Sequence, residues 1–426
     1  MPPASDLPPP LRPRLAELAR LFLKLGFTAF GGPAAHVALM EEEVVNRRQW
    51  LDRQHFLDMI SAVNLIPGPN STELAIHVGW VRAGWPGLIV AGCCFIVPAM
   101  LIILPLAWCY VTYGARPAVG SALVGIKACM VAIVAVALYR FARTGIKDAF
   151  GVAVALLALV VAAFCTHYGI PQQELIILTA AAIAGTLRYG RKRVGGGGGG
   201  VPMSTAPPAN LAKSSKSLPL FAALPLAAGA AGFSAQIAQM ALFFLKVGAT
   251  LFGSGYVLAS FLHNGLVERH RWLTERELLD AIAVGQVTPG PLLTASTFIG
   301  YVLGADKFGG GVGGGLLAGV IATAAIFLPS FLLVGLLGPF LPRLRQSPKV
   351  RGALDGMNAA VVSLIAIVTL WFAGSVFLRP TGGGIDWLSV GIAVTSLAVL
   401  LWTKVNATWL ILAAGAIGIL AARIVA

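Results

Sequence analysis

Long, unbroken apolar runs alternate with short polar stretches along this 426-residue chain. Most of the runs approach the ~20 residues that an α-helix needs to cross a bilayer. A transmembrane barrel would instead show alternating segments of about ten residues. Because lipid-exposed backbone must satisfy its own hydrogen bonds, the pattern predicts an all-α polytopic membrane protein. The spans are expected at 87–113, 118–139, 149–166, 172–188, 218–233, 316–340, 353–373, 387–402 and 406–425.

The chain also repeats itself at an offset of 222 positions. FLKLGFTAFGG (22–32) aligns with FLKVGATLFGS (244–254), and NLIPGPNST (64–72) aligns with QVTPGPLLT (286–294). Such long matches at one fixed offset indicate an internal duplication. We therefore expect two repeats built on the same plan.

A glycine-, proline- and serine-rich stretch separates the repeats and has the composition of a flexible linker. It is not a phosphate-binding loop, because no strand precedes it and no GK[ST] follows it. The expected organisation is a cytoplasmic tail, a first repeat, a cytoplasmic linker, a connecting transmembrane helix and a second repeat. Their bounds are 1–19, 20–190, 191–217, 218–234 and 235–426.

Lysines and arginines predict the orientation, because cytoplasmic loops of membrane proteins are enriched in them. The linker is rich in basic residues and is expected inside. The loop at Arg116 is poor in them, whereas the loop that aligns with it, around Arg345, is rich. The two repeats are therefore expected to have inverted topology, with the N-terminus cytoplasmic and the C-terminus external.

Proline and glycine interrupt four further apolar regions, at 20–40, 55–82, 242–262 and 277–304. Each is either a crossing or a re-entrant hairpin. Counted as crossings, these discontinuous helices bring the expected total to about thirteen membrane segments. Inverted repeats with broken helices are typical of secondary transporters, whose sites lie where the repeats meet.

The PGP tripeptides predict what these breaks do. Proline lacks an N–H and disfavours helix before it, so one half-helix should end there and another begin. The start of a helix carries partial positive charge and attracts anions. A sharp loop outside the membrane is the alternative. The expected substrate-binding residues are Lys24, Thr28, Gly31, Gly32, Pro33, Asn64, Pro67, Gly68, Pro69, Asn70, Ser71 and Thr72, with Lys246, Thr250, Gly253, Ser254, Gln286, Pro289, Gly290, Pro291 and Thr294.

Two lysines occupy equivalent places before the first breaks. Lys24 and Lys246 share a helix face with Thr28 and Thr250, respectively, at a spacing of four residues. They either line an electropositive cavity or extend to the membrane surface. The duplication favours the cavity.

Three residues are candidates for coupling transport to an ion gradient. Glu73 and His77 share a helix face after the first PGP and could relay a proton, or form a satisfied buried pair. Lys127 is a further candidate positive group.

Composition excludes several classes of protein. Only 11% of residues are charged and 57% are hydrophobic, whereas soluble domains carry roughly 25% charged residues. The net charge of +14 lies in short clusters between apolar runs, so nucleic acid is not an expected partner. The five cysteines show no metal-type spacing, and no cofactor or metal is expected.

The broken segments and their flanks form a distinctive set: FGGP, EEEVVNRRQWL and NLIPGPNSTELAIHVGWVRAG, then FGSGY, RHRWLTEREL and VTPGPLLTASTFIGY. Together they resemble the chromate ion transporter (CHR) family in its long, two-domain form. The resemblance implies a plasma-membrane protein that exports chromate, driven by the membrane potential or the proton gradient. The second copy lacks counterparts of Asn70 and Ser71, so the two half-sites are not equivalent.

Three hypotheses follow from these patterns. The first is a secondary active exporter of chromate that confers chromate resistance, with sulfate or another tetrahedral oxyanion as the alternative substrate. The second is a channel-like anion pore without proton coupling. The third, a membrane enzyme, would need a convergent set of reactive side chains, but the six histidines are scattered. We therefore expect a non-enzyme whose partners are the oxyanion and the lipid bilayer, and a homodimer stays open.

Overall fold

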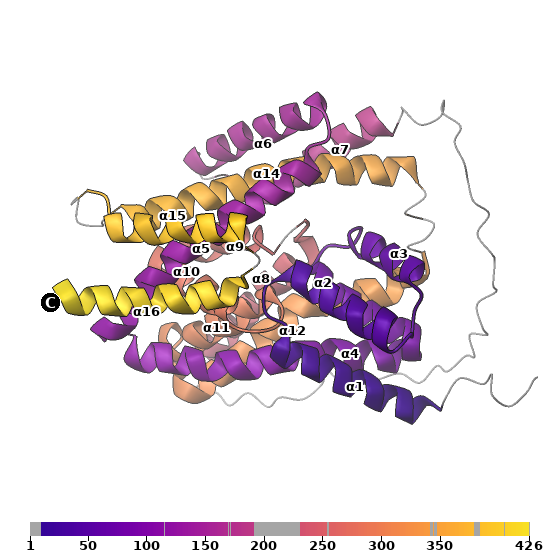
Figure 1. Ribbon diagram of the computed structural model, residues 1–426, viewed down its shortest axis with the longest axis horizontal. Coiled ribbons are helices and arrows are strands. Elements are labelled where there is room, and N and C mark those ends of the chain that lie inside the picture. The colour runs from indigo at the N-terminus through magenta and orange to yellow at the C-terminus, as the bar shows by residue number, and fades with distance from the viewer. Residues whose placement is uncertain are drawn as a thin grey trace, which may run out of the picture.

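The computed structural model confirms the all-α class for the residues it describes (Figure 1). In that part of the chain the β-structure is limited to one isolated bridge, between Leu378 and Ile385. The described residues are 10–114, 116–168, 170, 172–190, 231–253, 255–340, 344, 347–378, 384–403 and 405–425. The expected linker and most of the connecting helix lie outside them.

The helices of the first half are α1 (Leu11–Thr28), α2 (Pro33–Glu41), η1 (Glu42–Arg47), α3 (Arg53–Val63), α4 (Asn70–Tyr113), α5 (Pro117–Gly145), α6 (Ala149–His167) and α7 (Gln173–Tyr189). Those of the second half are α8 (Ala231–Thr250), α9 (Leu258–Leu262), η2 (His263–Arg269), α10 (Glu275–Val287), η3 (Leu292–Thr294), α11 (Ala295–Val302), η4 (Leu303–Lys307), α12 (Gly311–Leu337), η5 (Gly338–Phe340), α14 (Pro348–Phe377), α15 (Trp387–Trp402) and α16 (Ala407–Val425).

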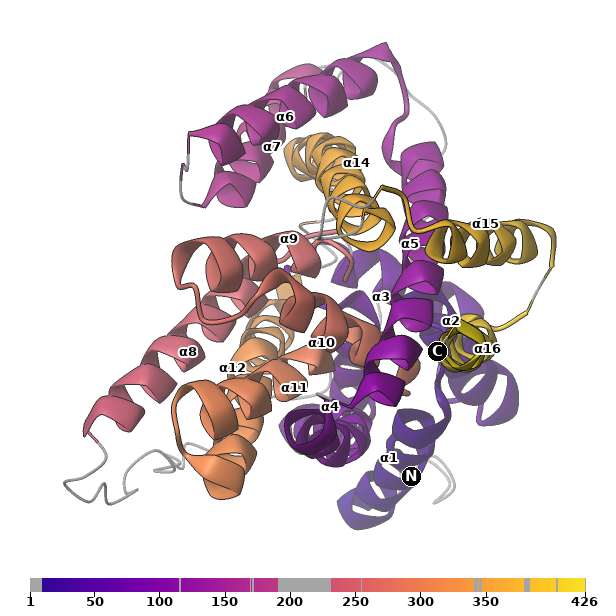
Figure 2. The ribbon, with the colours of Figure 1, turned by 90° about the vertical axis from the view of Figure 1, so that its left-hand side faces the viewer.

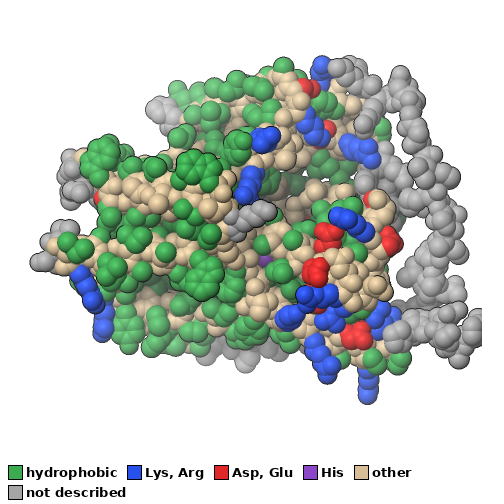
Figure 3. All heavy atoms as spheres, in the orientation of Figure 1, with side chains coloured by type: hydrophobic (Ala, Val, Ile, Leu, Met, Phe, Trp, Pro, Cys, Tyr) green, Lys and Arg blue, Asp and Glu red, His purple; other side chains and the backbone are tan. Residues whose placement is uncertain are grey.

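The protein is an integral membrane protein. Helices α4, α5, α12, α14 and α16 are each long and apolar enough to cross a membrane, and α6 and α15 are shorter apolar helices. Figure 3 shows hydrophobic side chains over most of one face, while charged side chains gather at the end that carries α1 to α3.

Helix α1 begins at Leu11, within the stretch expected to be a polar tail. Leu18, Leu21, Phe22 and Leu25 are buried along one face of it. Their spacing of three and four residues is the spacing of an apolar helix face, so this face anchors the helix on the core.

Helix α4 is folded back on itself. Its backbone leaves the helical region at Ala83 and Gly84, where Gly84 has a φ of +63°. The segments on either side pack so closely that a Cβ on Gly79 would overlap the carbonyl oxygen of Gly87. The half-helix that follows the first PGP therefore ends at this turn, and a separate long helix runs on to Tyr113.

The broken regions of the first half form two hairpins. Lys24 of α1 pairs with Glu43 of η1 at 2.7 Å, which places η1 back alongside α1. Arg82, at the end of the half-helix after PGP, pairs with Glu17 of α1 at 3.0 Å. The second hairpin thus returns to the end of the molecule where α1 begins.

The second half contains the same two hairpins. The Phe243 ring on α8 lies 6.2 Å from the His270 ring just beyond η2, measured between centroids. Lys307, at the end of η4, pairs with Glu277 in the first turn of α10 at 2.7 Å. Of the two alternatives open from the sequence, the contacts favour hairpins over single crossings in all four broken regions.

Long helices of the two halves pack against one another. Helix α14 packs against α7, and α16 against α5 (Figures 1 and 2). Small residues allow these close approaches: a Cβ on Gly356 would overlap the Ala181 carbonyl, and one on Gly125 would overlap that of Ala414. Small-residue contacts of this kind are typical of helices packed in membranes.

Candidate functional site

The tips of the four hairpins meet in the middle of the molecule. The Gly68 N–H donates to the Leu251 carbonyl at 2.7 Å, and the Gly290 N–H donates to the Ala29 carbonyl at 3.0 Å. Gly68 and Gly290 occupy equivalent positions in the repeats, as do Ala29 and Leu251. Each PGP tip is therefore hydrogen-bonded to the other half's first break, in a reciprocal arrangement.

The tripeptide PGP suits this contact for a chemical reason. Proline has no N–H, so glycine carries the only backbone donor of the tripeptide. Gly68 has a φ of +143° and Gly290 a φ of +91°, values that residues with a Cβ rarely adopt. The glycine is thus needed both for the backbone shape of the tip and for its donor.

A cavity of about 250 Å³ lies between these tips. It draws on the tips of both halves, on α5, on the end of α15 and on the start of α16. The residues that line it are Gly31, Gly32, Pro33, Ala34, Gly68, Pro69, Asn70, Ser71, Ile133, Val136, Ala137, Arg140, Phe141, Gly253, Gly255, Tyr256, Gln286, Leu292, Leu293, Leu400, Ala407 and Thr408.

Two helices start at the cavity. Helix α2 begins at Pro33 and α4 at Asn70, and both first turns contribute to the lining. Partial positive charge at these helix ends favours an anion in the cavity. The corresponding start in the second half is the short turn η3, which presents Leu292 and Leu293 instead. The site is therefore asymmetric, with its polar groups mainly on the first half.

Gln286 contributes a polar side chain from the second half. It lines the cavity beside Tyr256, with which it shares a side-chain hydrogen bond. A side-chain amide has two N–H donors and a carbonyl acceptor. The group can therefore also donate to an acceptor in the cavity, such as an anion oxygen.

Arg140 also lines the cavity, although the sequence analysis does not name it as a candidate. It lies on α5, more than one turn before the end of that helix. Its guanidinium forms no ion pair with any other described residue. The 29-residue length of α5, well beyond the ~20 residues of a crossing, is the signal that Arg140 could lie inside the site.

His36 is a second residue that the sequence analysis passed over. It lies on α2, three residues after Pro33, and is only 1% exposed. Its Nδ1 is 3.3 Å from Ser71 Oγ, and its Nε2 is 3.0 Å from the Ala29 carbonyl oxygen. His36 therefore lies directly behind the cavity wall.

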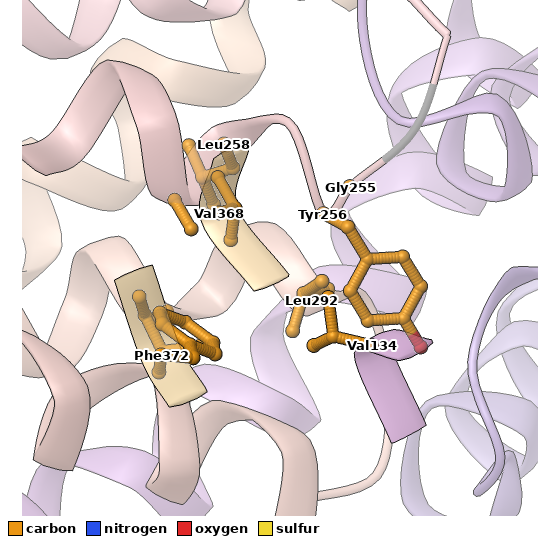
Figure 4. A pocket seen from close by; sticks show the side chains of 10 residues that line it. Val134, Gly255, Tyr256, Leu258, Leu292, Val368 and Phe372 are labelled. Atoms are coloured by element: carbon orange, nitrogen blue, oxygen red, sulfur yellow. The ribbon is translucent and has the colours of Figure 1, made fainter. Parts of the chain in front are cut away.

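An apolar wall bounds the cavity on the side of the second half. Gly255, Tyr256 and Leu292 line both the cavity and a neighbouring pocket of about 10 Å³. Figure 4 shows Tyr256 and Leu292 at one end of this pocket, with Val368 and Phe372 at the other. A space of that size holds at most about one water molecule, so the wall closes the cavity on this side.

The structure places the two lysines and their threonines outside the cavity. Lys24 pairs with Glu43, and hydrogen bonding by this lysine lowers the pKa of the Glu43 carboxyl. Thr28 donates to the Lys24 carbonyl, and Thr250 to that of Lys246. Lys246 lines a separate cavity of about 650 Å³ between α7, α8 and η2.

The other expected residues divide into two groups. Gly31, Gly32, Pro33, Gly68, Pro69, Asn70, Ser71, Gly253 and Gln286 line the cavity. The remaining ones support the tips without lining it: Asn64, which accepts from the Asn70 amide at 2.5 Å, and Pro67, Thr72, Pro289, Gly290, Pro291 and Thr294. Ser254 lies outside the described residues.

Glu73 is fully buried directly behind the first PGP tip. Its Oε1 accepts from Ser330 Oγ at 3.3 Å, and its Oε2 has no hydrogen-bond partner within the described chain. A Cβ on Gly68 would overlap Glu73 Oε1. The carboxyl group therefore reaches the backbone that lines the cavity, and His77 lies buried one turn further along the helix.

Lys127 is not at the cavity but in a buried ion pair between the halves. Its Nζ lies 2.9 Å from Asp280 Oδ1, and the Tyr110 hydroxyl donates to Asp280 Oδ2 at 2.9 Å. Asp280 thus neutralises the charge of Lys127, which the sequence analysis names among the candidates for coupling.

A polar cavity enclosed by broken helices of two similar halves is the arrangement of a membrane transporter. The chain belongs to the chromate transporter family, whose model matches residues 16–186 and 238–419. It is 29% identical to the chromate transport protein of Cupriavidus metallidurans over 415 residues, covering 96% of this chain and 93% of the relative. It is also 29% identical to a probable chromate transport protein of Synechococcus elongatus, covering 83% of each chain. No solved structure matches it.

Proposed function

We propose that this protein is a secondary active transporter that binds chromate in the cavity between the hairpin tips and exports it across the plasma membrane. The observation that carries the proposal is the convergence of Arg140, two helix starts and the Gln286 amide on one cavity. The relatives named above support chromate as the substrate. A volume of about 250 Å³ accommodates a tetrahedral oxyanion with a few waters, since each water occupies ~30 Å³.

The charges in the site match a dianion. Arg140 supplies one full positive charge, and the starts of α2 and α4 supply about half a charge each. The sum is close to two positive charges. The lysines expected from the sequence are not needed for this balance, because Arg140 takes their place.

The hairpins support an inverted-repeat topology with fewer crossings than the sequence suggested. If all four are re-entrant, each half crosses four times: by the long part of α4 with α5, α6 and α7, and by α12, α14, α15 and α16. The connecting span at 218–234 brings the total to nine. Figure 1 shows α16 ending at the opposite end of the molecule from the start of α1. That placement fits a cytoplasmic N-terminus and an external C-terminus.

Coupling to a proton gradient would involve Glu73 and His77. Glu73 is the carboxyl group nearest the first PGP backbone, and its unpartnered oxygen can take a proton without breaking a hydrogen bond. A channel-like pore and transport of sulfate or another oxyanion are the alternatives. The wall formed by Tyr256 and Leu292 favours a transporter, since an open pore has no such barrier.

The test is chromate uptake into inside-out membrane vesicles. We expect saturable uptake that requires energised membranes. Uptake should fall when valinomycin with potassium removes the membrane potential, when nigericin removes the pH gradient, or with either treatment. Uptake that does not saturate and ignores the pH gradient would favour the pore. Uptake no greater than in vesicles without the protein would refute the proposal.

A further inference from the structure

His36 lies between two hydrogen-bond partners, the Ala29 carbonyl and the Ser71 hydroxyl. The Ala29 carbonyl that faces His36 Nε2 also accepts the Gly290 N–H from the second PGP tip. On its other side the ring faces Ser71 Oγ, which lines the cavity. The imidazole thus stands between the second-half tip and the proposed anion position.

The carbonyl determines which ring nitrogen carries the proton in the neutral ring. A carbonyl oxygen can only accept, so Nε2 is the donor to Ala29. In the neutral imidazole the other nitrogen, Nδ1, is then an acceptor. Ser71 must turn its O–H toward Nδ1, and it presents only oxygen lone pairs to the cavity. Lone pairs oppose the binding of an anion.

A second proton on the ring reverses the role of Ser71. In the imidazolium both nitrogens donate, so Nδ1–H donates to Ser71 Oγ. The serine O–H is released and can donate to an oxyanion in the cavity. The ring also places a positive charge directly behind that serine. Both changes favour the anion.

We propose that His36 is a proton-responsive positioning residue, which turns the Ser71 hydroxyl toward the bound oxyanion when the ring becomes doubly protonated. The inference rests on the proposed function, because it assigns a control to the same cavity. By linkage, an anion that favours the imidazolium must be favoured by it in turn. Proton uptake and anion binding then occur together.

The acidic groups around the His36 ring have other partners, so a bound anion is the group that would stabilise a positive charge on it. The nearest charged groups on α1 and η1, Lys24 and Glu43, pair with each other. On α4, Glu73 is hydrogen-bonded to another helix, and on α5 Arg140 faces the same cavity. No ion pair to His36 exists among the described residues.

The direction of the pH effect follows from burial. Without an anion, burial of the ring disfavours the imidazolium. A dianion beside Ser71 favours it, since an opposite charge stabilises the protonated ring. A group whose pKa is higher in the bound state strengthens binding below the bound-state pKa, and the gain is lost as the pH rises through that value.

The experiment measures chromate binding to the purified full-length protein in nanodiscs by calorimetry, from about pH 8 to about pH 5, the range in which histidines commonly titrate. Chromate itself titrates in this range, so the readout is the ratio of the variant Kd to the wild-type Kd at each pH. For His36→Gln the ratio should rise as the pH falls, by at most about tenfold per pH unit for one linked proton. Ser71→Ala should show the same loss, and it leaves the histidine in place.

His55→Gln is the matched control, because His55 is exposed on α3 and away from the cavity. Its ratio should stay flat. Repeating the wild-type titration in two buffers of different ionisation enthalpy should show proton uptake on binding that is smaller in His36→Gln and Ser71→Ala. Equal pH profiles in wild type and both variants would overturn the inference while leaving the proposed function intact. Wild-type protein that binds no chromate would overturn both.

Discussion

Replacing Arg140 by glutamine tests the proposed site most directly. The substitution removes the one full positive charge among the cavity-lining residues while keeping a polar side chain of similar reach. Two unit charges about 4 Å apart interact by ~4 kcal/mol at an effective dielectric constant near 20. This value is an upper limit here, because the Arg140 side chain is exposed and therefore screened by solvent.

A charge-assisted hydrogen bond of ~1.5–3 kcal/mol is the better reference for an exposed guanidinium. It corresponds to a loss of chromate affinity of about 10- to 150-fold in Arg140→Gln. Arg140→Lys should recover part of this loss, because it keeps the charge but not the planar fork that can hold two oxygens. The assay is chromate Kd in nanodiscs, with the concentration for half-maximal vesicle uptake as a second measure.

Arg143→Gln is the matched control on the same helix. Arg143 is also exposed, but its guanidinium hydrogen-bonds the Tyr139 hydroxyl at 3.3 Å and does not line the cavity. The Arg143→Gln variant should keep a chromate Kd within about twofold of wild type, because a distant charge is screened by salt. Equal losses in the two variants would show that Arg140 acts only through the general surface potential. An unchanged Kd in Arg140→Gln would remove this residue from the site.

Three further predictions follow from the same geometry. Alanine at Pro67 and Pro69, or at Pro289 and Pro291, should lower chromate uptake by about tenfold or more, because each tip loses the backbone shape that supports its hydrogen bond to the other half. Normal uptake in correctly inserted variants would show that the breaks are only connections. Lys24→Gln should leave the Kd within about twofold and cost at most ~1 kcal/mol of stability in thermal melts, because an exposed ion pair contributes little; a large Kd change would restore this lysine to the site. A C-terminal alkaline phosphatase fusion should be active and a green fluorescent fusion dark, and the opposite pattern would contradict an external C-terminus.

The breaks and their meeting point could be predicted from the sequence because both depend on local chemistry. A PGP tripeptide cannot continue a helix, and its duplication at one fixed offset implies two related tips. The residues beside the breaks, from Gly31 to Pro33 and from Gly68 to Ser71, do line the cavity. In both breaks the backbone preferences of proline and glycine determine where the helix ends, and so which residues form the tip.

The charged residues could not be assigned in the same way, because their partners come from distant parts of the chain. Lys24 has Glu43 beside it only because η1 folds back along α1, and Lys127 meets Asp280 only because α5 packs on α10. Arg140 reaches the cavity because α5 extends beyond the length of a crossing. A charge in an apolar run thus indicates that a partner exists, but the fold decides which one.

The reciprocal hydrogen bonds suggest how one cavity could serve two sides of a membrane. Because each PGP tip is bonded to the other half's first break, displacement of one hairpin pulls on a tip from the opposite half. The halves differ where it matters: the first supplies Asn70, Ser71 and the helix starts, while the second supplies the wall formed by Tyr256 and Leu292. An anion held by the first half can therefore stay bound while the apolar wall of the second half moves. Under the proposed function, the first half holds the anion and the second half forms the barrier that has to open.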